Sequence, residues 1–190
     1  CIRDSILDRT FGQGSGQGYI ALAAGSIKNA TDEPDSTIAS AAQGALAFTV
    51  IPGSPDPQVL ILHTHATETY QTWDTPVYDP DFTARTKDTT LNMCAVGEAM
   101  TKVLNDAGIT TLHDTTLHDS PSYTESYARS AQTARRYLEE YPSIKVVLDV
   151  HRDAMESGDA RVRPLTTLDG QPTAQVLSLI HISEPHETRG

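Results

Sequence analysis

The 190-residue chain has few basic residues, few cysteines and no long apolar run, and each shortage excludes a class of protein. Lys and Arg total 14 against 25 Asp and Glu, so the formal net charge is -11. Most of such a surface repels a nucleic-acid backbone, which excludes nucleic acid as a partner. The two cysteines, Cys1 and Cys94, are too few for a disulfide framework, and Cys94 is expected to be a buried thiol in a helix.

The chain also lacks a membrane span and a signal peptide. No stretch approaches the ~20 apolar residues that cross a bilayer, and the first residues lack a basic-then-apolar pattern. Because the chain begins with Cys1 instead of Met, we expect that an upstream export or anchor segment has been lost.

The first 56 residues are predicted to form an N-terminal flank of loops and edge strands. Residues 11–18 are rich in Gly, Gln and Ser, and residues 30–54 alternate small residues with acidic residues and prolines. Short apolar runs at residues 19–25 and 46–51 fit edge strands.

From residue 58 onward the pattern is typical of an α/β domain. Continuous apolar runs indicate buried strands, helical spacing of apolar residues indicates helices, and Ser122 with Glu125 resembles a capping box that opens the second helix. The alternation of strands and helices predicts a mostly parallel central sheet flanked by helices. The expected elements, in order, are a strand at 59–62, a helix at 92–107, a strand at 109–112, a helix from 122 to about 141 and a strand at 146–150.

Chemically active side chains follow both buried strands. The first strand leads into His63, His65 and Glu68, and the later one leads into His151 and Arg152. Because sites in open α/β sheets lie at the carboxyl ends of the strands, these two groups should meet. Imidazole and carboxylate ligands suit Zn²⁺, and a catalytic zinc keeps three protein ligands with one open position. The sequence therefore predicts a metal shared by His65 and His151.

Two further histidines, His113 and His118, are each followed by an aspartate in the stretch after a strand. This position favours a substrate-lining or loop-fixing role over a catalytic one.

The chain resembles the stage II sporulation protein P family, which is related to the zinc-dependent N-acetylmuramoyl-L-alanine amidases. The segments that carry the resemblance are 59–70 (VLILHTHATETY), 121–123 (PSY), 141–145 (YPSIK) and 148–154 (LDVHRDA), with weaker similarity from about 18 to 177.

The resemblance implies an amidase_3-like α/β fold of the zinc-dependent phosphorylase/hydrolase type. It also implies hydrolysis of the amide between N-acetylmuramic acid and the L-alanine of the stem peptide in peptidoglycan. The family protein acts in endospore engulfment at the outer face of the cytoplasmic membrane, with stage II sporulation proteins D and M as partners.

Site residues follow from the same resemblance. His65 and His151 match the two histidine ligands of Zn²⁺, and the carboxylate ligand is either Glu68 or Asp88. Glu68 and Arg152 are the candidate catalytic residues, because a carboxylate moves the proton to the leaving amine and a fixed guanidinium orients a carboxylate or stabilises an oxyanion. The residues expected to bind substrate are His63, His118 and Asp153.

The end of the chain departs from the family. Related amidases take a last catalytic carboxylate from a late strand, whereas residues 179–190 do not look like the family and resemble peptides translated from sequencing-adapter DNA. We therefore expect an incomplete catalytic domain at residues 57–178, truncated at its C-terminal end and poorly soluble, followed by a tail at 179–190 that is an artefact.

Two other functions stay open. The same ligands suit a zinc endopeptidase or carboxypeptidase that cuts a different bond in peptidoglycan. A truncated domain is also compatible with a non-catalytic module that binds wall fragments.

Overall fold

The computed structural model describes residues 6–10, 14, 16–23, 25–46, 48–73, 75, 77, 79, 81–158 and 160–182, without the side chains of 180–182. In chain order the elements are β1 (Ile6–Thr10), β2 (Tyr19–Leu22), β3 (Gly25–Lys28), α1 (Asp35–Gln43), β4 (Val59–Leu62), α2 (Met93–Asp106), β5 (Thr111–His113), α3 (Ser126–Glu140), β6 (Val146–His151), β7 (Met155–Ser157), β8 (Ala160–Leu168), β9 (Gln171–Ala174) and β10 (Leu177–Ile182).

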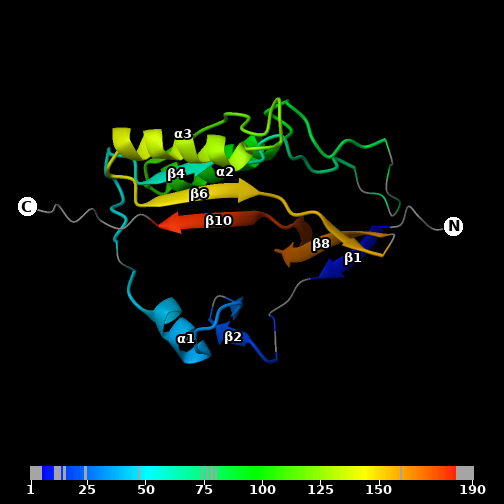
Figure 1. Ribbon diagram of the computed structural model, residues 1–190, viewed down its shortest axis with the longest axis horizontal. Helices are drawn as coiled ribbons and strands as arrows, with labels where there is room; N and C mark the ends of the chain where they lie inside the picture. Colours follow the sequence, from blue (N-terminus) through cyan, green and yellow to red (C-terminus); the bar gives the residue numbers. More distant parts are fainter. Residues whose placement is uncertain are drawn as a thin grey trace, which may run out of the picture.

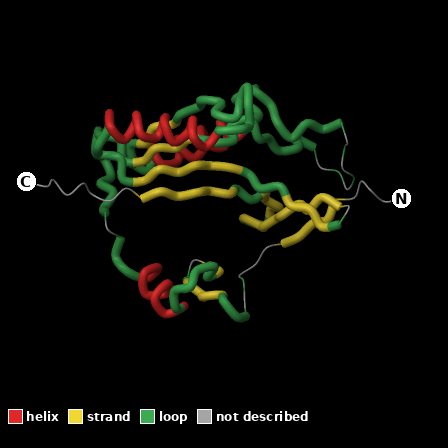
Figure 2. The backbone as a smooth tube through the Cα atoms, viewed as in Figure 1, coloured by secondary structure: helices red, strands yellow, loops and turns green. Residues whose placement is uncertain are grey.

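The central sheet has four strands in the order β10-β6-β4-β5. Its β5, β4 and β6 are parallel, as expected from the helices that connect them, but β10 runs antiparallel to β6. Beside it, β8 pairs parallel with β1 and antiparallel with β7 and β9. The prediction of a mostly parallel sheet is therefore wrong. After β6 the chain continues through β7, β8 and β9, with no helix among these elements, and returns to β6 in the opposite direction (Figures 1 and 2).

A helix covers each face of the central sheet because alternate residues of β4 point to opposite sides. Val59 and Ile61 pack with Met93 on the side of α2, and Leu60 and Leu62 face the side of α3. Figure 1 shows α3 lying along the sheet. The partly buried apolar residues that complete the two cores are Val96, Met100 and Leu104 from α2 and Ala134, Tyr137 and Leu138 from α3.

Helix α2 forms where the sequence predicts a helix at 92–107, and local features define both of its ends. The side chain of Asn92 accepts a hydrogen bond from the backbone N–H of Cys94 at 2.9 Å, so Asn92 caps the first turn. Gly108 follows the helix with a φ of +80°, a conformation that glycine adopts without strain. Cys94 is a buried free thiol, and burial raises its pKa to about 11.

The start of α3 differs from the prediction. Glu125 occupies the N-cap position with a φ of 66°, and no side chain there makes a capping hydrogen bond. The sequence pattern of a capping box is present, but its geometry is not formed, because the backbone enters the helix in the left-handed region. Tyr127, expected to face the core, is exposed on the side of His151.

The N-terminal flank contains more regular structure than expected. β2 and β3 form a two-stranded antiparallel sheet that includes the apolar run at 19–22. Residues 46–51 form no strand where they are described, and α1 occupies part of the predicted loop. Its sequence is rich in alanine, which is a small residue and also the best helix former. Figure 1 shows α1 and β2 apart from the central sheet.

Strand β10 crosses the predicted boundary between residues 178 and 179. Residues 183–190, which make up most of the predicted tail, lie outside the described residues, as do residues 1–5. None of the helices in the described part has the length and apolar character needed to cross a membrane.

Candidate functional site

His65 and His151 meet at one edge of the central sheet. His65 lies three residues after the end of β4, and His151 is the last residue of β6, its parallel neighbour. The ring centroids lie 5.3 Å apart, and the ring planes make an angle of 70°. The chain leaves β4 toward β5 on one side and reaches β6 on the other, so this edge is a topological switch point, where α/β sheets bind ligands. Both side chains are buried, with exposed fractions of 5% and 3%.

Asp149 supports this edge from within β6. One carboxylate oxygen accepts the backbone N–H of Thr64 at 2.8 Å and the other accepts the Thr64 hydroxyl at 2.6 Å. Oδ1 of Asp149 also lies 2.8 Å from Nε2 of His151. Burial raises the pKa of Asp149, but the contact with His151 and the hydrogen bonds from Thr64 outweigh it and keep that pKa below its usual value. The carboxylate is therefore an anion beside the imidazole.

Aromatic side chains from the start of α3 surround His65. Its ring stacks on Tyr123, with centroids 4.5 Å apart, and meets the edge of Tyr127 at 5.2 Å. The Ser126 hydroxyl lies 3.4 Å from Nδ1 of His65. Burial lowers the pKa of His65, and the nearby His151 lowers it further, so the imidazole is neutral at pH 7. A neutral ring is the form that binds a metal.

Glu68 is the carboxylate closest in sequence to His65, and it faces the strand of His151. Its Oε2 accepts the backbone N–H of Arg152 at 3.3 Å, and its Oε1 lies 3.4 Å from the guanidinium of Arg85. Burial raises the pKa of Glu68, although Arg152 and Arg85 counteract the shift. A carboxylate with a raised pKa beside two imidazoles is suited to exchanging a proton.

A second anchor fixes the turn between His65 and Glu68. The buried Asp119 accepts the Thr67 hydroxyl at 2.6 Å and a guanidinium N–H of Arg85 at 2.6 Å. Arg85 also lies over the ring of Tyr123, at 4.9 Å from its centroid. The turn that carries His65 and Glu68 is thus held from both sides.

The metal-ligand set is only partly assembled. Within the described residues, no group of three or more His, Cys, Asp or Glu side chains is placed to hold a metal ion. His65 and His151 do fit a shared ion, because Nε2 of His151 is buried without a hydrogen bond: its contact with Asp149 lacks hydrogen-bond geometry. A buried imidazole nitrogen without a hydrogen bond, on a ring whose centroid lies 5.3 Å from that of a second histidine, is suited to binding a metal ion.

Two histidines predicted to bind substrate lie inside the protein instead. His63 bonds through Nδ1 to the carbonyl of Val150 and through Nε2 to Nε2 of His113, each at 2.9 Å. His118 bonds through Nδ1 to the carbonyl of His63 at 2.8 Å and through Nε2 to the Thr133 hydroxyl at 3.0 Å. Both are buried with both ring nitrogens engaged, which is the loop-fixing arrangement.

Gly97 explains how α2 approaches this pair of rings. A Cβ atom at Gly97 would lie 2.5 Å from Nε2 of both His63 and His113. Nδ1 of His113 lies 3.3 Å from the carboxylate of Glu98, so the ring pair extends from the core toward the surface of α2.

Asp88, the alternative third ligand, lies in an exposed turn. Its carboxylate accepts the backbone N–H and the hydroxyl of Thr90, at 2.9 and 2.7 Å, and these bonds lower its pKa. The structure shows no contact between Asp88 and either ligand histidine among the described side chains, whereas Glu68 sits against the backbone that follows His151.

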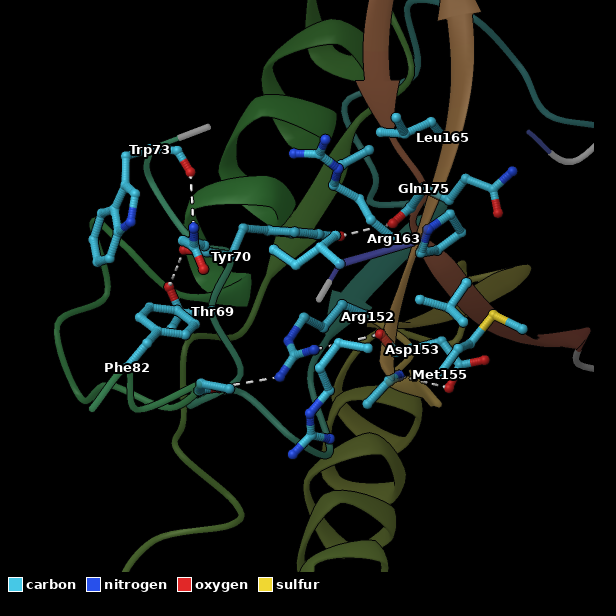
Figure 3. Close-up of a pocket in the computed structure, with 18 residues that line it drawn as sticks. Thr69, Tyr70, Trp73, Phe82, Arg152, Asp153, Met155, Arg163, Leu165 and Gln175 are labelled. Atoms are coloured by element: carbon cyan, nitrogen blue, oxygen red, sulfur yellow. Dashed lines mark hydrogen bonds between the residues drawn. The ribbon is translucent and has the colours of Figure 1, made fainter. Parts of the chain in front are cut away.

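Arg152 and Asp153, which follow His151 in the sequence, line a cavity of about 340 Å³ (Figure 3). The guanidinium of Arg152 donates to the carbonyls of Ala84 and Asp153, at 3.3 and 3.4 Å. Asp153 accepts the backbone N–H of Ala154 at 2.8 Å and is exposed. Of the three residues predicted to bind substrate, Asp153 is the one that borders this cavity.

The sequence prediction missed the supporting residues. Asp149 had a readable signal, since a carboxylate inside an apolar strand requires a partner. Tyr123 ends the quoted Pro-Ser-Tyr segment and Tyr127 lies four residues further on, but neither was predicted to have a role beside His65. Arg85 and Asp119 come from loops whose approach to the site only the three-dimensional structure reveals.

Comparison with known proteins gives one family. The model of the family described as stage II sporulation protein P matches residues 20–188, which is most of the chain. No curated protein and no solved structure shows significant similarity to it. The family has hydrolase-like activity and indicates a sporulation-related role associated with peptidoglycan. The chain belongs to the stage II sporulation protein P family.

Proposed function

We propose that this chain is the catalytic part of a zinc-dependent N-acetylmuramoyl-L-alanine amidase. The observation that carries the proposal is the meeting of His65 and His151 at the carboxyl ends of two parallel strands, 5.3 Å apart between ring centroids. Family membership supports a role on peptidoglycan, and the neutral state of His65 at pH 7 supports metal binding.

His65 and His151 would hold the ion, with Glu68 as the third ligand. When bound, zinc would polarise the carbonyl of the scissile amide and lower the pKa of its bound water toward ~7. As an alternative to ligation, Glu68 would move a proton to the leaving amine, because burial raises the pKa of its carboxyl. Asp149 contacts Nε2 of His151 and bonds to Thr64, so it fixes the ring of His151 relative to the end of β4.

The cellular role proposed for this activity is removal of stem peptides from glycan during endospore engulfment. By family resemblance, the site of action is the outer face of the cytoplasmic membrane, and stage II sporulation proteins D and M are the expected partners. The substrate is peptidoglycan.

The test measures zinc content and the products released from purified peptidoglycan. We expect about one zinc per chain and release of intact stem peptides with new L-alanine amino ends. His65→Ala and His151→Ala should each lower activity by at least about 100-fold and lower zinc content, because each removes a ligand. His113→Asn is the matched control, a histidine on the α2 side of the sheet that should keep its zinc.

Three results would contradict the proposal. If no new L-alanine amino ends form, cleavage of the peptide cross-links would indicate a zinc endopeptidase. Removal of C-terminal residues from the stem peptide would indicate a carboxypeptidase. Absence of stoichiometric zinc, with wall binding equal in wild type and both alanine variants, would indicate a non-catalytic wall-binding module.

A further inference from the structure

The cavity lined by Arg152 is built by two separate parts of the chain. One wall comes from the loop after β4 and includes Tyr70, Trp73 and Phe82, and the other comes from the second sheet and includes Leu165. Figure 3 shows Trp73 and Phe82 together on one side, with Leu165 on the other. Arg152 directly follows His151, so the cavity begins one residue from the proposed metal ligand.

Arg152 brings a positive charge for which the described residues show no ion pair, although the carboxylate of Glu68 interacts with it electrostatically. In the described part of the chain, its guanidinium donates to two backbone carbonyls, and its Nε is buried without a hydrogen-bond partner. The other two guanidinium groups of the cavity already contact carboxylates, Arg161 with Glu156 and Arg163 with Asp8. Arg152 is therefore the group in this cavity with capacity to bind an anion.

The remaining walls combine apolar and aromatic side chains with polar ones, among them Thr69, Gln71 and Asp153. Trp73 meets Phe82 edge to face, with centroids 5.6 Å apart, and is 48% exposed. The hydroxyl of Tyr70 is already used, because it donates to the carbonyl of Gln175 at 2.9 Å. The cavity thus offers mainly apolar contact, together with the guanidinium of Arg152 and the carboxylate of Asp153.

We propose that this cavity binds the stem peptide of the substrate through a free carboxylate, with Arg152 as the anchor. The inference rests on the proposed amidase function. In the intact substrate the lactyl carboxyl of the sugar forms the scissile amide, so it carries no charge. The stem peptide, in contrast, carries free carboxylates. A guanidinium matches a carboxylate with two parallel N–H donors.

The overall charge makes such an anchor necessary. At a formal net charge of -11 the protein repels an acidic peptide at long range. A local guanidinium at the cavity supplies the attraction that the rest of the surface lacks. This placement also gives Arg152 a different role from oxyanion stabilisation: its guanidinium lies in the cavity and contacts the loop at Ala84, which assigns it to substrate positioning.

Trp73 makes the inference directly testable because it is the single tryptophan of the chain. A stem tetrapeptide with free carboxylates is titrated into the full chain while the fluorescence of Trp73 is followed, beside the same peptide with every carboxylate amidated. We expect a saturable change with the acidic peptide and at least about tenfold weaker binding of the amidated one, since a hydrogen-bonded charge is lost.

Variants separate the anchor from the metal centre. Arg152→Gln should weaken binding of the acidic peptide at least about tenfold, and Arg152→Lys should weaken it less because the charge stays. Arg135→Gln, which removes an exposed guanidinium from α3, is the matched control and should bind as wild type. His65→Ala should still bind the peptide although it loses turnover. Circular dichroism confirms that each variant is folded.

The failures are distinguishable. Equal binding of acidic and amidated peptides, or unchanged binding by Arg152→Gln, would overturn the carboxylate anchor while leaving amidase activity standing. A response of Trp73 to an uncharged glycan disaccharide, with none to the peptide, would assign the cavity to the sugar. Peptide binding without any amidase product would leave the cavity assignment standing and overturn the proposed reaction.

Discussion

At the scale of the residue, the site depends on side chains that hold the two imidazoles in place. His151 has Asp149 beside Nε2, and the same carboxylate fixes Thr64 at the end of β4. One anion therefore links the ends of β4 and β6, the two strands that carry His65 and His151. The geometry of the pair should fail when that link is removed.

Asp149→Asn tests this link. The amide keeps the size of the side chain but loses the negative charge, and it turns one of the acceptors for Thr64 into a donor. We expect zinc affinity and kcat/KM to fall by about 10–100-fold, and the free energy of unfolding to fall by about 1–3 kcal/mol. Metal titration and urea unfolding measure the two effects.

The control for this substitution is Asp106→Asn, which removes an exposed carboxylate that contacts Lys102 on α2. It should change both quantities little, because exposed ion pairs contribute about 0–1 kcal/mol. An Asp149→Asn variant that kept wild-type zinc affinity would show that His151 does not need this carboxylate.

At the scale of the element, α2 illustrates how local signals position the site. Asn92 accepts the N–H of Cys94 and donates through Nδ2 to the carbonyl of Thr86 at 3.1 Å, so it ties the helix start to the loop that contains Arg85. The backbone of Met93 also bonds to Ala66 in the turn after His65. The beginning of α2 is therefore part of the support for that turn.

Asn92→Ala and Asn92→Asp separate the two bonds of this cap. The alanine variant loses both and should lower the free energy of unfolding by about 1–2 kcal/mol. The aspartate variant keeps the acceptor for Cys94 and loses the donor to Thr86, so it should be less destabilised. Thermal unfolding ranks the variants, and an aspartate variant as unstable as the alanine variant would show that the loop contact dominates.

The elements that the sequence predicted share one property: their signals are local. The apolar run at 59–62 and the helix stop at Gly108 are written in neighbouring residues. β10 was not predicted as an antiparallel partner of β6, because strand pairing depends on where the chain returns after β7, β8 and β9. The helix α1 was missed because small residues indicate loops and helices alike.

As with the fold, the sequence predicted part of the candidate site. His65, His151 and Glu68 follow strand ends, and the sheet brings them together. His63 and His118 were expected to bind substrate; alternation along β4 turns His63 toward α2, and His118 bonds to its backbone. Orientation after a strand end depends on the turn, which the sequence does not specify.

At the scale of the whole molecule, buried histidines couple folding to pH. His63 is fully buried, and burial lowers its pKa from 6.5 to about 4, with the carbonyl of Val150 opposing the shift and His113 adding to it. Asp149 favours its protonation and His151 disfavours it. Since the pKa is lower in the folded state, protons bind the unfolded state preferentially between about pH 6.5 and 4.

We therefore expect the contribution of His63 to the free energy of unfolding to be constant above pH 6.5. This contribution should decrease as the pH falls from 6.5 toward 4. One group contributes a slope of at most ~1.4 kcal/mol per pH unit. His65, whose pKa is also lowered, acts in the same direction. Glu68 opposes the trend near its own raised pKa, so the cleanest window is pH 7 to 5.

Urea unfolding at pH 7, 6 and 5, with a chelator present throughout, measures this slope without competition between protons and zinc. His63→Asn should flatten the profile, because the substituted side chain does not titrate. The ring resonances of His63 in the wild-type protein give its pKa independently of the variant. Two results would contradict this prediction: a free energy of unfolding that stays constant from pH 7 to 5, or a pKa near 6.5 for His63 in the folded protein. Either result would mean that water reaches the ring and that α2 packs less closely against β4.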